Sequence, residues 1–256
     1  MVVGAAGRMG REVVRAIGAQ EDLHLVAAVD RVMVGEDALT LAGVTGTPVF
    51  IEDSLGGAIA QARPDAAVDF TLPDVVKGNA RAAITAGVAC VIGASGLGEP
   101  DLEELAALCA QHSTPALVVP NFALGAVLMM QFAAQAARYF DSAEIIELHH
   151  SGKLDSPSGT ARATAGLMAD AWGGRSGVAP VEDQPARGLM EQGVPIHSVR
   201  LPGLVAHQEV IFGGLGQTLS IRHDSISRES FMPGVVLALR KVRSLTGLAV
   251  GLDKVL

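Results

Sequence analysis

The sequence predicts an α/β fold, with an N-terminal Rossmann-type, doubly wound parallel sheet followed by a C-terminal α+β domain that contains a mixed or antiparallel sheet. Over the first 120 residues, short apolar runs alternate with helical patterns, which is typical of a parallel sheet. A glycine-rich turn, GAAGRMG at 4–10, joins the first apolar run to the first helical pattern. Between residues 196 and 224, glycines rather than helices separate three strand-like segments, which indicates antiparallel or mixed pairing.

The high apolar fraction suits a parallel sheet that is buried on both faces, because the strands of such a sheet are unbroken apolar runs. The expected strands are residues 2–3, 24–30, 66–70, 88–95 and 115–121, and the expected helices are residues 8–19, 54–63, 74–86 and 100–112.

The second half of the chain opens on a long helical pattern. Its expected elements are a helix at 124–140, a strand at 143–150, a helix at 160–172, a loop at 173–180 and strands at 196–201, 205–213 and 217–224. The last helical stretch, 228–244, is apolar enough to pack back on the first domain. We therefore expect a dinucleotide-binding domain of residues 1–120 plus about 231–256, and a substrate-binding domain of about 121–230.

Composition narrows the class of protein. Of the 256 residues 49% are hydrophobic, yet no run of 18 apolar residues lacks a charge or a helix breaker, so we expect no membrane span. The formal net charge is -8 without a basic cluster, which argues against nucleic acid as a partner. Cys90 and Cys109 lie in apolar surroundings and no signal segment opens the chain, so we expect a cytoplasmic protein.

The glycine turn and an acid downstream predict dinucleotide binding. Gly4, Gly7 and Gly10 would allow a tight turn and bring a pyrophosphate close to the backbone at a helix start. Asp30 ends the next expected strand, 20 residues past Gly10, where an acid would bind the ribose hydroxyls of NAD. A glycine-rich turn also occurs for packing reasons alone, but this context favours the cofactor.

Other residues bear on the cofactor. Arg31 would partly offset the repulsion between Asp30 and the extra phosphate of NADP, or stack on adenine, or lie as a solvated surface charge. We therefore expect NADH to be favoured and NADPH tolerated. The segments GASG (93–96) and VPNFALG (119–125) follow expected strands at the edge where nicotinamide cofactors lie, although ordinary strand-end turns would look the same.

The segment HHSGKLDSPSGTA, residues 149–161, concentrates titratable and hydrogen-bonding groups. His149 and His150 end a strand and should point to opposite faces, so they are expected to have different roles. Ser158 has the features of a helix N-cap, and the N–H groups that follow would hold a carboxylate or phosphate. With Lys153 and His150 nearby, the segment predicts an anion pocket, and it leaves His149 as a proton donor.

The segment is open to two further interpretations. A histidine pair can bind metal, but further ligands at suitable spacing are not evident nearby, so we expect no metal. Asp155 is as compatible with a turn or an orienting contact as with a catalytic role.

Together these motifs make the chain resemble the 4-hydroxy-tetrahydrodipicolinate reductases (dihydrodipicolinate reductases) of lysine and diaminopimelate synthesis, over nearly its whole length. The shared motifs are GAAGRMGR, GASG, VPNFALG, ELHHSGKLDSPSGTA and the region from VRLPGLVAHQEVIFGG to RESFMPG. The resemblance implies hydride transfer from NADH or NADPH to a cyclic unsaturated dicarboxylate after loss of water. It also implies a homotetramer formed through the C-terminal sheet.

The resemblance assigns roles residue by residue. His149 matches the family's proton donor and Lys153 its second catalytic residue, while His150, Gly159 and Thr160 match contacts to substrate carboxylates. The cofactor contacts that it implies are Gly4, Ala5, Ala6, Gly7, Arg8, Met9, Asp30, Arg31, Gly93, Ala94, Ser95, Val119, Pro120, Asn121 and Phe122.

Three features depart from the family pattern. Ala94 stands where many members have threonine, Asp224 follows His223 where many have arginine, and the first strand is short. Another two-domain dehydrogenase would also account for the glycine turn and Asp30, but not for the 149–161 segment. A non-catalytic dinucleotide sensor would have no use for His149 and Lys153 beside an anion site.

Overall fold

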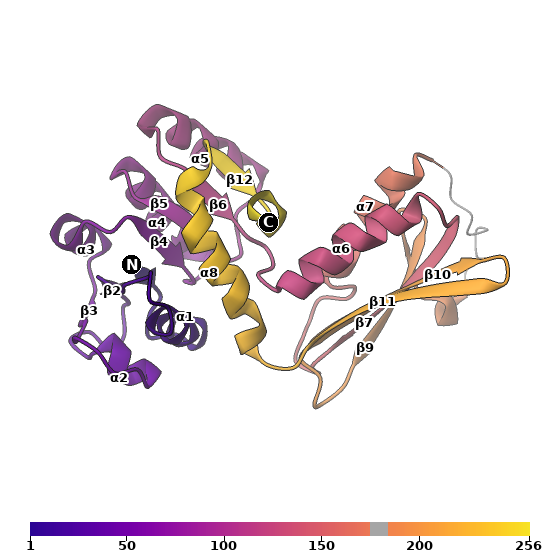
Figure 1. Ribbon diagram of the computed structural model, residues 1–256, viewed down its shortest axis with the longest axis horizontal. Coiled ribbons are helices and arrows are strands. Elements are labelled where there is room, and N and C mark those ends of the chain that lie inside the picture. The colour runs from indigo at the N-terminus through magenta and orange to yellow at the C-terminus, as the bar shows by residue number, and fades with distance from the viewer. Residues whose placement is uncertain (175–183) are drawn as a thin grey trace. The chain divides into compact units, whose positions relative to one another are not determined.

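The computed structural model describes residues 1–174 and 184–256, and it divides the chain into two compact units (Figure 1). Unit 1 contains residues 1–122 and 231–256, and unit 2 contains residues 123–230. The expected loop at 173–180 lies outside the described residues from residue 175 onward. None of the described helices has the length and apolar character needed to cross a membrane.

Unit 1 is a seven-stranded, wholly parallel sheet with strand order β12-β6-β5-β4-β1-β2-β3. Successive strands are added on both sides of the adjacent pair β1 and β4. The sheet is therefore doubly wound, with its switch point between these two strands. Its strands are β1 (Val2–Val3), β2 (Ala28–Val29), β3 (Ile51–Glu52), β4 (Ala66–Asp69), β5 (Ala89–Ile92), β6 (Ala116–Val118) and β12 (Leu248–Val250).

The helices of unit 1 pack on this sheet and bury its apolar strands. They are α1 (Arg8–Gly18), α2 (Ala38–Ala42), α3 (Leu55–Ala62), α4 (Pro73–Thr85), α5 (Glu99–His112) and α8 (Met232–Lys241). The central strands β4 and β5 are buried almost throughout, as their unbroken apolar runs predict.

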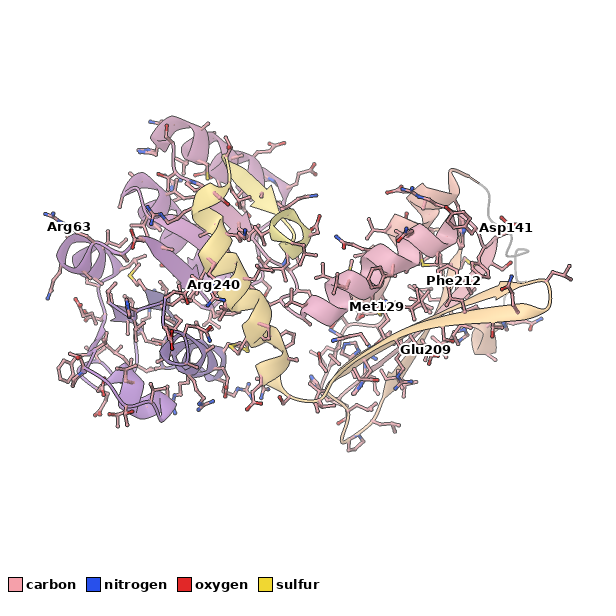
Figure 2. All side chains as sticks on the ribbon, in the orientation of Figure 1. Arg63, Met129, Asp141, Glu209, Phe212 and Arg240 are labelled. Atoms are coloured by element: carbon pink, nitrogen blue, oxygen red, sulfur yellow. The ribbon has the colours of Figure 1, made fainter. Side chains whose placement is uncertain are left out.

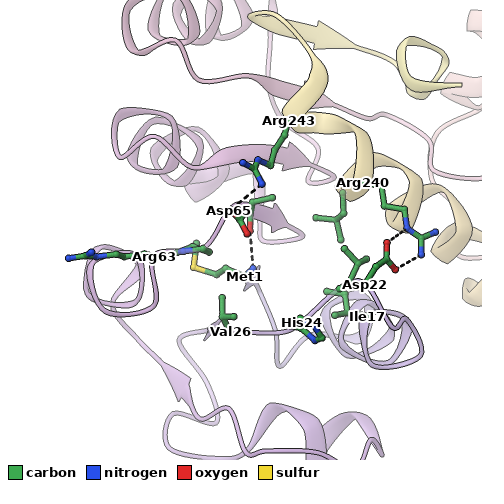
Figure 3. Close-up of a pocket in the computed structure, with 13 residues that line it drawn as sticks. Met1, Ile17, Asp22, His24, Val26, Arg63, Asp65, Arg240 and Arg243 are labelled. Carbon is green, nitrogen blue, oxygen red and sulfur yellow. Dashed lines mark hydrogen bonds and ion pairs between the residues drawn. The ribbon is translucent and has the colours of Figure 1, made fainter.

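The C-terminal segment, residues 231–256, belongs to unit 1. The guanidinium of Arg240 on α8 binds the carboxylate of Asp22 at 2.6 Å, and Arg243 pairs with Asp65 (Figure 3). The Arg240 guanidinium also donates to the side-chain oxygen of Gln20. A Cβ on Gly234 would lie 2.0 Å from the carbonyl oxygen of Phe122, so only glycine permits this approach. At the hollow shown in Figure 3, Arg240 and Arg243 are each paired with an acid.

Unit 2 is a mixed five-stranded sheet with order β11-β10-β7-β9-β8. Its strands are β7 (Ser142–His149), β8 (Leu189–Glu191), β9 (Val194–Arg200), β10 (Ala206–Gly214) and β11 (Gln217–Ser225), and its helices are α6 (Leu124–Ala137) and α7 (Gly159–Trp172). The pairing of β7 with β9 is parallel and the other pairings are antiparallel. The predicted fold class is therefore confirmed in both parts.

Side chains alternate across the sheet of unit 2. Phe212 of β10 is fully buried in a core that includes Trp172 of α7 and Ala133 of α6, so the two helices cover one face (Figure 2). Glu209 lies on the opposite face and pairs with Arg222 of β11 at 3.2 Å. This alternation decides which residues of β7 are buried.

Several sequence predictions need correction. The expected strand at 24–30 is only two residues long, Ala28–Val29, and the expected helix at 228–244 is α8 flanked by short 3-10 segments. The elements α2, β3, β8 and β12 were not predicted, because each has only two to five residues and shows no periodicity.

Candidate active site

The four segments expected to bind a cofactor each begin directly after a parallel strand of unit 1. Gly4 follows β1, Asp30 follows β2, Gly93 follows β5 and Val119 follows β6. The carboxyl ends of parallel strands meet at one edge of the sheet, which is where ligands bind in this fold class. The expected cofactor residues are thus brought to one edge within unit 1.

The glycine turn is built for a close backbone approach. Gly4 has a φ of 83°, in the left-handed region that favours glycine. A Cβ on Gly10 would lie 2.0 Å from the carbonyl oxygen of Gly4, so a larger residue would force α1 away from β1. Both glycines are therefore required by the turn itself.

The start of α1 fits an anionic group. Its N-cap is Gly7, which has no side chain to accept a hydrogen bond from the first turn. By contrast, Asp37 caps α2 and Ser54 caps α3 with side-chain oxygens. The N–H groups of the first turn of α1, around Arg8 and Met9, thus receive no side-chain acceptor from the N-cap, which suits a bound pyrophosphate.

Asp30 is tied to the glycine turn. One carboxylate oxygen accepts a hydrogen bond from the N–H of Ala6 at 2.9 Å, and the other accepts from the N–H of Val32 at 3.2 Å. Asp30 is half-buried and the adjacent Arg31 is exposed. The acid at the end of β2 thus lies beside the turn, as cofactor binding requires.

Aromatic rings line the remaining strand ends. The rings of Phe70, just after β4, and Phe122 are 5.3 Å apart, and a Cβ on Gly93 would lie within 2.8 Å of both. Ala94 donates its N–H to the carbonyl oxygen of Asp69 at 3.2 Å. A threonine at this position is therefore not needed for that backbone contact. Ser95 and Pro120 are exposed.

Sequence reasoning missed Asp69, the last residue of β4. Its side chain is buried and accepts hydrogen bonds from the hydroxyl of Thr71 at 2.5 Å and the amide of Asn79 at 2.9 Å. Burial raises the pKa of this carboxyl group, although these hydrogen bonds oppose the rise. An acid that ends an apolar strand was the available signal for this position.

His149 is the last residue of β7, and its Nδ1 lies 2.5 Å from Oε2 of Glu147. Glu147 is fully buried and the His149 side chain is 13% exposed. Burial lowers the pKa of His149 below its ordinary value, although the contact with Glu147 opposes this effect. One ring nitrogen is therefore held by the protein, while the ring remains partly accessible.

The loop after β7 carries the other expected groups. His150 is exposed, whereas His149 is half-buried. The ammonium group of Lys153 pairs with the carboxylate of Asp155 at 2.7 Å. This pairing gives Asp155 an orienting contact, which the sequence left open, and it lowers the pKa of the Asp155 carboxyl group.

The start of α7 has the predicted N-cap. The hydroxyl oxygen of Ser158 accepts a hydrogen bond from the N–H of Ala161 at 3.2 Å. The next residue, Gly159, has open space where a Cβ would lie, and Thr160 belongs to the same first turn. The expected substrate contacts at Gly159 and Thr160 thus lie at an open helix start in unit 2.

Sequence reasoning also missed Glu147 and Arg200. The guanidinium of Arg200 binds both carboxylate oxygens of Glu147, at 2.8 and 2.7 Å. Glu147 shares the buried face of β7 with Ala143 and Ile145. An acid at a buried position of an alternating strand was the signal that could have singled out Glu147.

Other predictions concern residues away from this cluster. Asp224 lies in an ion-pair cluster, where its carboxylate is 2.6 Å from Nδ1 of His207 and 2.9 Å from Nε of Arg222. Both cysteines are buried, and burial raises their pKa. Among the described residues, no group of three or more His, Cys, Asp or Glu side chains is placed to hold a metal ion.

Comparison with known families adds independent evidence. A model described as "Dihydrodipicolinate reductase, N-terminus" matches residues 1–122, and one described as "Dihydrodipicolinate reductase, C-terminus" matches residues 125–256. The chain belongs to the dihydrodipicolinate reductase family. The resemblance seen in the sequence motifs is therefore confirmed.

Relatives of this family match along the full chain. A protein of Moorella thermoacetica named 4-hydroxy-tetrahydrodipicolinate reductase is 52% identical over 258 residues, covering 100% of this chain and 97% of that protein. A protein of the same name from Gloeobacter violaceus is 48% identical, covering 100% and 98%.

Solved structures agree on the fold. The dipicolinate-bound dihydrodipicolinate reductase from Paenisporosarcina sp. TG-14 has a TM-score of 0.87 and 40% identity, covering 100% of this chain and 98% of that one. An amine dehydrogenase from Mycobacterium smegmatis has a TM-score of 0.69 at 14% identity, covering 100% and 95%, which reflects a shared fold. Together with family membership, the Rossmann-type fold identifies the chain as an NAD(P)H-using oxidoreductase.

Proposed function

We propose that this member of the dihydrodipicolinate reductase family reduces hydroxy-tetrahydrodipicolinate to tetrahydrodipicolinate, with loss of water, in diaminopimelate and lysine biosynthesis. The observation that carries the proposal is the arrangement at the end of β7. There His149 is held at one ring nitrogen, and the loop carrying Lys153 leads within ten residues to the open start of α7. A proton donor and an anion site close together suit an anionic substrate.

The cofactor site is assigned to unit 1. Bound NAD(P)H supplies the hydride, and the protein supplies orientation and electrostatics. The N–H groups around Gly7, Arg8 and Met9 would hold the pyrophosphate. The segments at 93–95 and 119–122 would lie against the nicotinamide end.

The chain's own residues then handle a proton and two carboxylates. Hydride addition to a conjugated imine leaves electron density on the ring, which a proton must neutralise. We assign this proton to Nε2 of His149, because Nδ1 faces Glu147. Lys153, His150 and the N–H groups of Gly159 and Thr160 would bind the substrate carboxylates.

We further propose that NADH is favoured over NADPH. The carboxylate of Asp30 lies beside the glycine turn, where it would accept hydrogen bonds from the ribose hydroxyls and repel a 2′-phosphate. The exposed Arg31 would soften that repulsion, so NADPH should also be used.

The assembly and location of the protein are part of the same proposal. We assign dinucleotide binding to unit 1 and substrate binding to unit 2, and we expect a homotetramer formed through the sheet of unit 2 in the cytoplasm. Sedimentation equilibrium measures the assembly. A mass of four chains agrees with this expectation, and a monomer contradicts it.

The activity is tested with NADH and enzymatically generated hydroxy-tetrahydrodipicolinate. Loss of NADH absorbance that depends on both the protein and the dicarboxylate supports the reductase. Cofactor binding without loss of absorbance would favour a dinucleotide sensor. Oxidation of other amino or hydroxy acids with NAD⁺, in place of this activity, would favour another dehydrogenase.

A further inference from the structure

The carboxylate of Glu147 is the centre of a buried hydrogen-bond network. It lies two residues before His149 on the same face of β7 and is fully buried. Oε2 is 2.5 Å from Nδ1 of His149, while Oε1 accepts a hydrogen bond from the N–H of Ser158 at 3.2 Å. Arg200 binds both oxygens. One carboxylate thus connects the strand that ends at His149 to the N-cap of α7.

This network determines which nitrogen of His149 carries a permanent proton. Burial opposes ionisation of Glu147, but hydrogen bonds from Arg200, Ser198 and His149 outweigh it and lower the pKa of the carboxyl group. An ionised carboxylate can only accept hydrogen bonds. Nδ1 of His149 must therefore be the donor, which leaves Nε2 as the nitrogen that gains and loses a proton.

Arg200 extends the network to the loop that carries Lys153. The same Nη2 atom that binds Glu147 also donates to the backbone carbonyl oxygen of Asp155 at 2.7 Å. Asp155 in turn pairs with Lys153 through its carboxylate. Arg200 lies opposite His149 in the parallel pairing of β9 with β7, so the sheet register fixes its position.

We infer that Glu147 and Arg200 are a positioning pair for the reaction, which fixes His149, the Lys153 loop and the start of α7 in one arrangement. This inference rests on the proposed function, because it assigns the pair to the proton transfer by His149. Neither residue needs to touch the substrate. A hydrogen-bonded orienting carboxylate of this kind commonly fixes both the tautomer and the ring plane of a reacting histidine.

The first test replaces Glu147 by glutamine, which keeps the shape and removes the charge. Glu147→Gln should lower kcat by about tenfold or more. Of the groups that act electrostatically on His149, namely Glu147, Lys153 and Arg200, only Glu147 favours its protonated form. Loss of the Glu147 charge should therefore lower the pKa of His149. The fall of kcat/KM at high pH should then begin about one pH unit lower than in the unmodified protein. The dissociation constant for NADH should stay within about twofold, because the pair lies in unit 2.

Glu144 offers a matched control on the opposite face of β7. Its carboxylate also binds a histidine and an arginine, with 2.7 Å to Nε2 of His197 and a contact with Arg187. Glu144→Gln should leave kcat and the pH profile unchanged. Equal effects of the two variants, or an unchanged kcat and pH profile in Glu147→Gln, would overturn the positioning role.

A second measurement keeps the inference testable if Glu147→Gln fails to fold. Imidazole ¹⁵N NMR on the unmodified protein, with His149 assigned by loss of its signals in His149→Gln, should show neutral His149 with the proton on Nδ1. A proton on Nε2 instead would overturn the inference. This measurement needs no turnover. A wild-type protein that is inactive would therefore count against the proposed function alone.

Discussion

Asp30 accepts a hydrogen bond from the backbone N–H of Ala6 at 2.9 Å, so the acid that directly follows β2 also braces the glycine turn after β1. Substitution of Asp30 therefore changes both a charge and a support of the turn. The isosteric change to asparagine largely separates the two, because the amide oxygen can still accept from Ala6 and only the longer, exposed hydrogen bond from Val32 is lost.

Asp30→Asn should shift cofactor preference toward NADPH, because repulsion of the 2′-phosphate is removed while the turn is kept. We expect the ratio of kcat/KM for NADH over NADPH to fall by about tenfold, which corresponds to about 1.4 kcal/mol. Asp30→Ala should shift the ratio in the same direction and bind both cofactors more weakly. An unchanged ratio in both variants would show that Asp30 does not face the ribose.

His149→Gln should lower kcat by about a hundredfold or more, the usual contribution of a general acid. Binding of NADH should be little changed, because His149 belongs to unit 2 and the expected cofactor residues belong to unit 1. Steady-state turnover and NADH fluorescence titration measure the two effects. Turnover within about twofold of the unmodified protein would rule out the assignment of His149 as proton donor.

The pH dependence of activity should follow the protonated form of His149. Burial lowers the pKa of this histidine below its ordinary value of 6.5, and a proton donor works only when protonated. As pH rises above that pKa, kcat/KM for the dicarboxylate should therefore fall about tenfold per pH unit. This descending limb of the pH profile should be absent from the residual activity of His149→Gln. A limb that persists there unchanged would belong to another group.

The glycine turn makes a prediction about stability. Gly10→Ala should lower the free energy of unfolding by about 1–3 kcal/mol, because the added Cβ would lie 2.0 Å from the carbonyl oxygen of Gly4. Gly78 of α4 is exposed with open space around it, so Gly78→Ala should raise the same quantity by about 0.5–1 kcal/mol. Urea unfolding measures both, and equal shifts would contradict the account of the turn.

Much of this molecule can be predicted from local sequence. The apolar runs of β4 and β5 indicate buried parallel strands, and the glycine turn indicates the junction of β1 and α1. The helix-start pattern SPSGTA indicates Ser158 as an N-cap, and its hydroxyl caps its own turn, as the pattern predicts. Signals of this kind depend on neighbours a few residues away, so a single sequence contains them.

The rest depends on contacts that a sequence does not show. Arg200 meets Glu147 across 53 positions of the chain, and only the parallel pairing of β9 with β7 brings them together. Strands such as β3 and β12 have two or three residues, so they are defined by their partners rather than by their own pattern. The buried network behind His149 therefore became visible only in the folded chain.

The central claim is that the chain transfers a hydride from a nicotinamide cofactor to a cyclic dicarboxylate. Its most direct test is turnover of enzymatically generated hydroxy-tetrahydrodipicolinate with NADH that carries deuterium at both C4 positions, followed by mass spectrometry of the product. We predict one deuterium on a ring carbon of tetrahydrodipicolinate for each NADH oxidised. A product without deuterium, or no oxidation of NADH by a protein that binds it, would contradict the claim.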